Sequence, residues 1–94
     1  MPINTYQYAL PQGTAVLVVP ADNMPQEVCI HNHEHSSSKE IFIGGDSSVT
    51  DSNGIHTVAT QTSTIVIRPG DELWAYTVES GGANLHIMTV TKRD

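Results

Sequence analysis

Short apolar segments that alternate with turn residues are the feature that most constrains the fold of this 94-residue chain. They recur at intervals of about ten residues, the spacing typical of β-sandwiches and barrels. Val, Ile and Thr fill 27 of the 94 positions, and β-branched residues favour sheets over helices. No long stretch keeps a helical period, so no helix beyond one or two turns is expected. The sequence predicts one antiparallel β-sandwich, either jelly-roll-like or immunoglobulin-like.

Six or seven strands are predicted, most of them bounded by turn residues such as Gly, Pro, Asn and Asp. They are Ala15–Val19, Glu27–His33, Glu40–Ile43, Ser63–Arg68, Glu72–Val78 and Leu85–Thr91, with a further short strand near Val58. Side chains alternate between the two faces of a strand, so one set of positions faces the core. The predicted core consists of Val16, Val18, Val28, Ile30, Ile41, Ile43, Ile65, Ile67, Leu73, Leu85 and Ile87.

Three parts are predicted along the chain: an N-terminal arm of residues 1–14, a β-sandwich domain of residues 15–91 and a solvated tail of residues 92–94. Within the arm, Thr5–Leu10 lies between Pro2 and Pro11 and carries two tyrosines. This segment either pairs as an edge strand of its own domain or reaches onto a neighbouring subunit.

Charge and hydropathy exclude several classes of partner. The chain has four basic and ten acidic residues, a net charge of −6, whereas nucleic-acid binding depends on Lys and Arg. No apolar run approaches the roughly 20 residues that cross a bilayer, and no leader pattern begins the chain. We therefore expect no nucleic-acid or membrane partner and synthesis in a cytoplasm.

The strand Glu72–Val78 is apolar on both faces. Leu73 and Ala75 point to one layer, and Trp74, Tyr76 and Val78 point to another. A domain of this size rarely covers both faces of a strand by itself, and aromatic residues are enriched in interface cores. We expect either the N-terminal segment or a second copy to cover this face, and the second is preferred. The residues assigned to an oligomer or capsid interface are Tyr6, Tyr8, Trp74 and Tyr76.

Three histidines stand at alternate positions in His31-Asn32-His33-Glu34-His35. On a strand they share one face, and neighbouring ones lie roughly 6.5–7 Å apart at Cα, so two of them could bind one ion. Imidazole suits zinc, copper, nickel and iron, and Glu40 or Glu34 could complete the site. Alternatively, these histidines are solvated polar residues on the outer face, or they titrate within a subunit interface.

The segment His33-Glu34-His35, followed by Glu40, also resembles half of one cupin motif. The resemblance implies a small metalloprotein with His33, His35 and Glu40 as ligands. Two glycines of that motif are replaced here by Glu27 and Ser47, and the histidine expected soon after Pro69-Gly70 is missing. No Gly-x-Ser-x-Gly elbow is present, and the single Cys29 is expected to be structural. The preferred prediction is therefore that the protein is not an enzyme and has no cofactor.

The stretch from about residue 26 to residue 91 resembles small virion proteins of tailed bacteriophages. The resemblance rests on Ile41-Phe42-Ile43-Gly44-Gly45-Asp46, Val49-Thr50, Ser52-Asn53-Gly54, Ile65-Val66-Ile67 and Gly70-Asp71-Glu72-Leu73-Trp74-Ala75. It implies a β-sandwich capsid decoration protein that sits on the virion, binds the major capsid protein and forms a homotrimer. A receptor-binding or glycan-binding virion module is the alternative within the same resemblance. If three chains met near His31–His35, their imidazoles would hold a metal ion or would repel one another when protonated.

Overall fold

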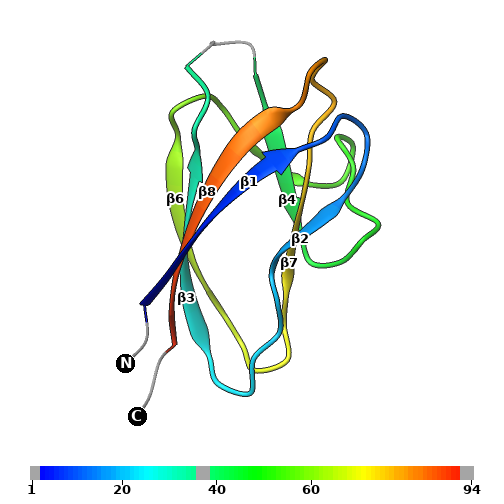
Figure 1. Cartoon of the computed structure of the whole chain (residues 1–94). Coiled ribbons are helices and arrows are strands. Elements are labelled where there is room, and N and C mark those ends of the chain that lie inside the picture. Colours follow the sequence, from blue (N-terminus) through cyan, green and yellow to red (C-terminus); the bar gives the residue numbers. More distant parts are fainter. Residues whose placement is uncertain (1–2, 36–38, 92–94) are drawn as a thin grey trace.

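The computed structural model describes residues 3–35 and 39–91 and shows two four-stranded β-sheets packed face to face (Figure 1). One sheet has the order β1-β8-β3-β6 and the other β2-β7-β4-β5. The strands are β1 (Ile3–Leu10), β2 (Val16–Val19), β3 (Gln26–Asn32), β4 (Ile41–Gly44), β5 (Ile55–Thr57), β6 (Thr62–Ile67), β7 (Leu73–Tyr76) and β8 (Ala83–Thr91). No helix long and apolar enough to cross a membrane occurs in these two ranges.

Each strand of the first half of the chain pairs with its mirror strand in the second half. β1 pairs with β8, β2 with β7, β3 with β6 and β4 with β5, all antiparallel. The chain is therefore one long hairpin whose tip is the loop between β4 and β5. The further pairs β3–β8 and β4–β7 roll this hairpin into two layers. This topology is that of a jelly roll. The predicted β-sandwich is therefore confirmed, and of its two predicted types the jelly roll is the one observed.

The core lies between the two sheets and follows the alternation that the sequence predicts. On β3 every second residue from Gln26 to Asn32 is buried, and the residues between them face outwards. All predicted core residues are buried except two. Val16 is partly buried against the core. Ile65 is 45% exposed, because β6 pairs only with β3 and forms an edge of its sheet.

The N-terminal segment is an edge strand of the sandwich, which is the first of the two alternatives predicted for it. β1 pairs with β8 in continuous register from Ile3 to Leu10. Leu10 is 2% exposed, and the Tyr8 hydroxyl donates a hydrogen bond to the Val18 carbonyl at 3.0 Å, which joins the two sheets. Backbone pairing along the whole segment therefore fixes it as an edge strand. The predicted tail at residues 92–94 lies outside the described residues.

Candidate functional site

Four histidine rings gather on the outer face of the β1-β8-β3-β6 sheet. His31 is on β3 and lies opposite His86 on β8. The chain continues past β3 and brings His33 onto the same patch, where its ring stacks on that of His86 with centroids 3.9 Å apart and planes 13° apart. His35 contacts His33 edge-on at 5.3 Å. These four residues are called the histidine cluster below.

Backbone and side-chain hydrogen bonds hold the histidine cluster in place. His31 Nδ1 lies 2.9 Å from Thr62 Oγ1 on β6, and the His33 amide donates to the Asn84 carbonyl at 3.0 Å. The Glu34 carboxylate accepts hydrogen bonds from the Asn84 amide and from Asn84 Nδ2. His33 Nδ1 is buried and has no hydrogen-bond partner among the described residues. The cluster is thus packed against its own strands rather than loosely solvated.

Asn32 sets the direction of the chain as it enters this cluster. Its side chain is fully buried, and its Nδ2 donates to the carbonyls of Lys39 and Thr57, both at 3.3 Å. Its Oδ1 accepts a hydrogen bond from the Glu34 amide at 3.2 Å. A buried polar side chain needs such partners, since an unsatisfied one costs roughly 1–3 kcal/mol. Asn32 therefore ties β3 to β5 of the other sheet.

The surroundings of His86 disfavour its protonation. The pKa of His86 is lowered, first by desolvation and then by the neighbouring His33 and His31 rings, whose positive charge would oppose a second charge. His86 consequently favours the neutral imidazole, the state in which histidine binds metals.

The ring positions suit pairs of metal ligands rather than a triad. Two imidazoles on one tetrahedral zinc ion have ring centres about 5 Å apart, given Zn–N bonds of about 2.0–2.1 Å. His31 and His33 are 5.4 Å apart by this measure, but the stacked His33 and His86 rings are too close. Within residues 3–35 and 39–91, no three His, Cys, Asp or Glu side chains are arranged to hold one ion. The predicted metal role of His31, His33, His35 and Glu40 stays a prediction.

Glu40 does not join the histidine cluster. Its Oε2 lies 2.9 Å from Nε2 of His56 on β5, and the His56 ring in turn stacks on Phe42 at 5.5 Å. The physical reason is topological, because Glu40 leads into β4 and so belongs to the other sheet. Sequence spacing alone placed Glu40 near His33 and His35, whereas the fold gives it a different histidine.

His86 and His56 are the two site residues that sequence reasoning missed. Neither lies near another histidine in the sequence. The strand register places His86 opposite His31 and His56 opposite Phe42. His86 alternates with buried Leu85 and Ile87, so its outward orientation was predictable. Predicting that His86 lies opposite His31 would require knowing that β8 lies beside β3.

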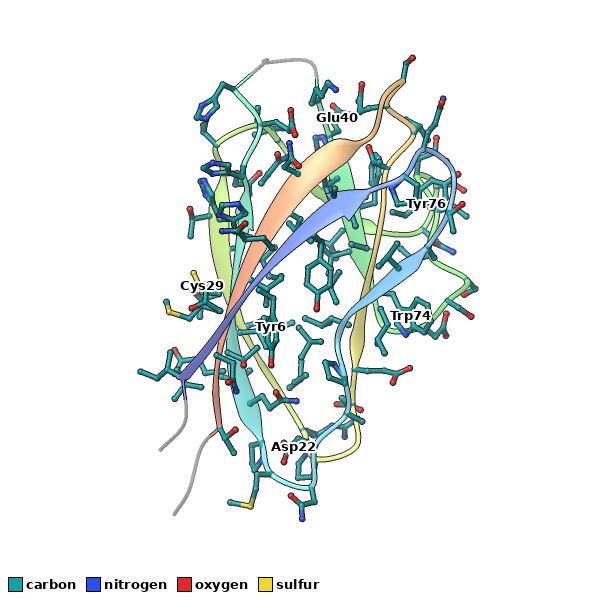
Figure 2. The ribbon with its side chains drawn as sticks, viewed as in Figure 1. Tyr6, Asp22, Cys29, Glu40, Trp74 and Tyr76 are labelled. Carbon is teal, nitrogen blue, oxygen red and sulfur yellow. The ribbon has the colours of Figure 1, made fainter. Side chains whose placement is uncertain are left out.

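A second candidate surface is the outer face of the β2-β7-β4-β5 sheet. Trp74 and Tyr76 lie on this face, on the side of the sandwich opposite Cys29 (Figure 2). Leu17 on β2 is the cross-strand neighbour of Trp74, and Phe42 on β4 is that of Tyr76. Leu17, Trp74 and Tyr76 are each only partly buried. This group of four residues is called the tryptophan face below.

The loop between β4 and β5 covers one side of the tryptophan face. Its Val49 is 4% exposed, and a Cβ atom at Gly44 would lie 2.7 Å from the Val49 side chain. A Cβ atom at Gly54 would lie 2.7 Å from Phe42. Both glycines are therefore needed for the close approach of this loop. The chain itself thus covers part of the face, through this loop and not through the predicted N-terminal segment.

Tyr6 and Tyr8 lie apart from the tryptophan face. Both are on β1 of the other sheet, with ring centroids 6.3 Å apart. Tyr6 is 37% exposed. Burial raises the pKa of Tyr8, and Tyr6 adds to this effect. Of the four predicted interface residues, Trp74 and Tyr76 share one surface, whereas the tyrosines of β1 help to close the sandwich.

The fold has a counterpart among solved structures. A chain from Bacillus endospore appendages, described as a novel family of disulfide-linked pili, aligns with a TM-score of 0.56 at 10% sequence identity. The alignment covers 98% of this chain and 87% of that chain. At this identity the likeness shows the fold alone. No protein-family model and no curated protein matches the sequence.

Proposed function

We propose that the protein is a structural subunit of a viral particle, a capsid decoration protein that binds the outer shell of a tailed bacteriophage as a homotrimer. The tryptophan face carries this proposal. The outer face of an antiparallel sheet is ordinarily polar, yet here Leu17, Trp74 and Tyr76 lie together on it and are partly exposed. Such a surface is suited to burial against a second protein molecule.

Net charge and multiplicity support the same proposal. A charge of −6 keeps free copies apart in solution, so each contact between subunits is expected to be weak. Repetition over a symmetric shell turns weak contacts into tight attachment, because the first contact raises the effective concentration of the next. The major capsid protein is the proposed partner, and the virion surface is the proposed location.

Cosedimentation tests the proposal. Purified protein is mixed with tailed-phage capsids that lack their own decoration protein and, separately, with host cells. A decoration protein pellets with the capsids up to a fixed number of copies and does not pellet with the cells. Pelleting with the cells alone would support the receptor-binding or glycan-binding alternative and would overturn the proposal.

Two matched variants locate the binding surface. Trp74→Glu adds a negative charge to the tryptophan face, and we expect at least about a tenfold loss of capsid binding, which corresponds to 1.4 kcal/mol. Thr5→Glu adds the same charge to the exposed outer face of the other sheet and should bind as the wild type does. Equal binding by both variants would place the contact elsewhere.

A second candidate function is that of a subunit of an extracellular appendage. The observation that favours it is the likeness in fold to the endospore appendage chain. Residues 1–94 contain one cysteine, which could link two copies but could not extend a disulfide-linked polymer. Electron microscopy of concentrated protein without capsids distinguishes the two functions, since an appendage subunit forms filaments and a decoration protein does not.

A further inference from the structure

The β6 edge of the first sheet lacks the features that normally protect an edge strand. β6 pairs with β3 on one side, and no strand lies on its other side within the described part of the chain. Native edges are usually guarded by charged residues, proline, bulges or short length. β6 has six residues, Thr-Ser-Thr-Ile-Val-Ile, without a charge or a proline. Its free backbone groups can therefore accept another strand.

The side chains of this edge are apolar on both faces. Val66 is 58% exposed on the outer face, and Ile65 is 45% exposed towards the gap between the sheets. Ile55 of β5, the edge strand of the other sheet, is 74% exposed. With buried Ile30 and Ile43, Ile55 and Ile65 line an open apolar pocket of about 230 Å³. This side of the sandwich is thus incompletely covered.

Charge indicates which molecule covers the edge. Residues 55–67, which include β5 and β6, contain no Asp, Glu, Lys or Arg in a chain whose net charge is −6. Two copies of an acidic protein repel each other where their carboxylates meet, so they associate best through an uncharged surface. A strand edge is also complementary to itself, because two identical strands can exchange backbone hydrogen bonds around a twofold axis.

We infer that β6 pairs with β6 of a second copy, antiparallel and around a twofold axis that passes between the two Ile65 residues. The register follows from the faces of the sheet, since outward residues must lie opposite outward residues. With the axis at Ile65, each Ile65 lies opposite the Ile65 of the other copy, and Thr64 lies opposite Val66. The two four-stranded sheets then form one continuous sheet, and the exposed side chains of Ile65 and Val66 become buried.

The other edges are less suited to this contact. β5 has only three residues, and β2 contains a register shift between Leu17 and Val19. β1 is long and uncharged, but pairing of β1 with β6 joins different surfaces and produces an open chain of copies instead of a dimer. A strand pair of this length buries less than the roughly 1,200 Å² of a standard interface. The dimer should therefore depend strongly on protein concentration.

Sedimentation velocity over a range of protein concentrations tests the inference. The wild type should show a monomer–dimer equilibrium. Ile65→Lys should weaken dimerisation at least about tenfold, because two like charges would face each other across the axis. Val66→Lys should weaken it too, because it replaces an apolar side chain that the contact buries and places two like charges diagonally across the axis. Met88→Lys is the matched control, since Met88 is 43% exposed on β8, an inner strand of the same sheet. Circular dichroism confirms that each variant is folded.

Cysteine cross-linking tests the register. In a Cys29→Ser background, Ile65→Cys places two thiols directly opposite each other, so mild oxidation should give covalent dimers. Ser63→Cys faces Ile67 of the other copy and should not cross-link. Equal cross-linking of both variants, chains longer than a dimer, or a monomer at every concentration would overturn the inference. Because purified protein is used without capsids and the Trp74 face is untouched, the outcome is independent of the proposed function.

Discussion

At the scale of single residues, the most unusual feature is the packing of four imidazoles on one patch of an acidic protein. His33 and His86 stack at 3.9 Å, and the pKa of His86 is lowered by desolvation and by its neighbours. Positive charges on two stacked rings repel each other. His86 should therefore make folding stability depend on pH in the histidine range.

We expect the protein to be less stable in mild acid than at neutral pH. Because the folded-state pKa of His86 lies below its ordinary value of 6.5, the unfolded chain binds this proton first as the pH falls. The contribution of His86 to folding stability is fully present above about pH 6.5 and is lost as the pH falls through its lower folded-state pKa. Thermal melts at about pH 8 and about pH 5 should show a lower midpoint in acid.

Two substitutions test whether His86 causes this loss of stability in acid. His86→Asn should reduce the difference in melting temperature between the two pH values. His35→Asn, at the exposed end of the cluster, should leave most of it. If wild type and His86→Asn respond to pH equally, the cluster does not control the acid stability.

At the scale of strands and turns, alternation predicted most of the fold. Nearly all predicted core residues are buried, and the histidines of the predicted strand face outwards with Cys29. What alternation cannot give is the neighbour of each strand. From the sequence Ile65 is predicted to be a core residue, because the sequence does not show that β6 is an edge strand. Glu40 is predicted to be a partner of His35, because the sequence does not show that β4 belongs to the other sheet. These errors concern long-range pairing, which depends on the whole hairpin and not on local spacing.

The turn between β7 and β8 gives a prediction about how β1 is held. Gly82 has a φ of +80°, and a Cβ atom there would clash with the Leu10 carbonyl oxygen. We expect Gly82→Ala to lower the free energy of unfolding by at least about 2 kcal/mol, from the left-handed conformation and the backbone clash together. Chemical denaturation measures this loss.

Gly81→Ala is the matched control for this turn. Gly81 has a φ of +82°, but nothing lies within 4 Å of its added Cβ atom. This substitution should cost only about 1–2 kcal/mol for the left-handed conformation. Equal losses at the two positions would show that the contact between the turn and the end of β1 does not matter.

At the scale of the whole molecule, the jelly roll presents surfaces of different character on its several sides. The histidine cluster lies on the outer face of one sheet and the tryptophan face on the other. The uncharged β6 edge lies at the rim of the sandwich. A subunit with more than one contact surface can join several neighbours, which is the requirement for building or covering a shell.

Another protein molecule is expected to cover the tryptophan face during assembly, and Trp74, the only tryptophan in residues 1–94, reports on this directly. The most direct measurement records Trp74 fluorescence as purified protein is mixed with increasing amounts of tailed-phage capsids that lack their own decoration protein, after the signal of the capsids alone is subtracted. We expect the emission to move to shorter wavelength and iodide quenching to fall as the protein binds the capsids. If the protein pellets with the capsids while emission and quenching stay unchanged, or if it does not bind them, the tryptophan face is not the contact that attaches the protein to the shell.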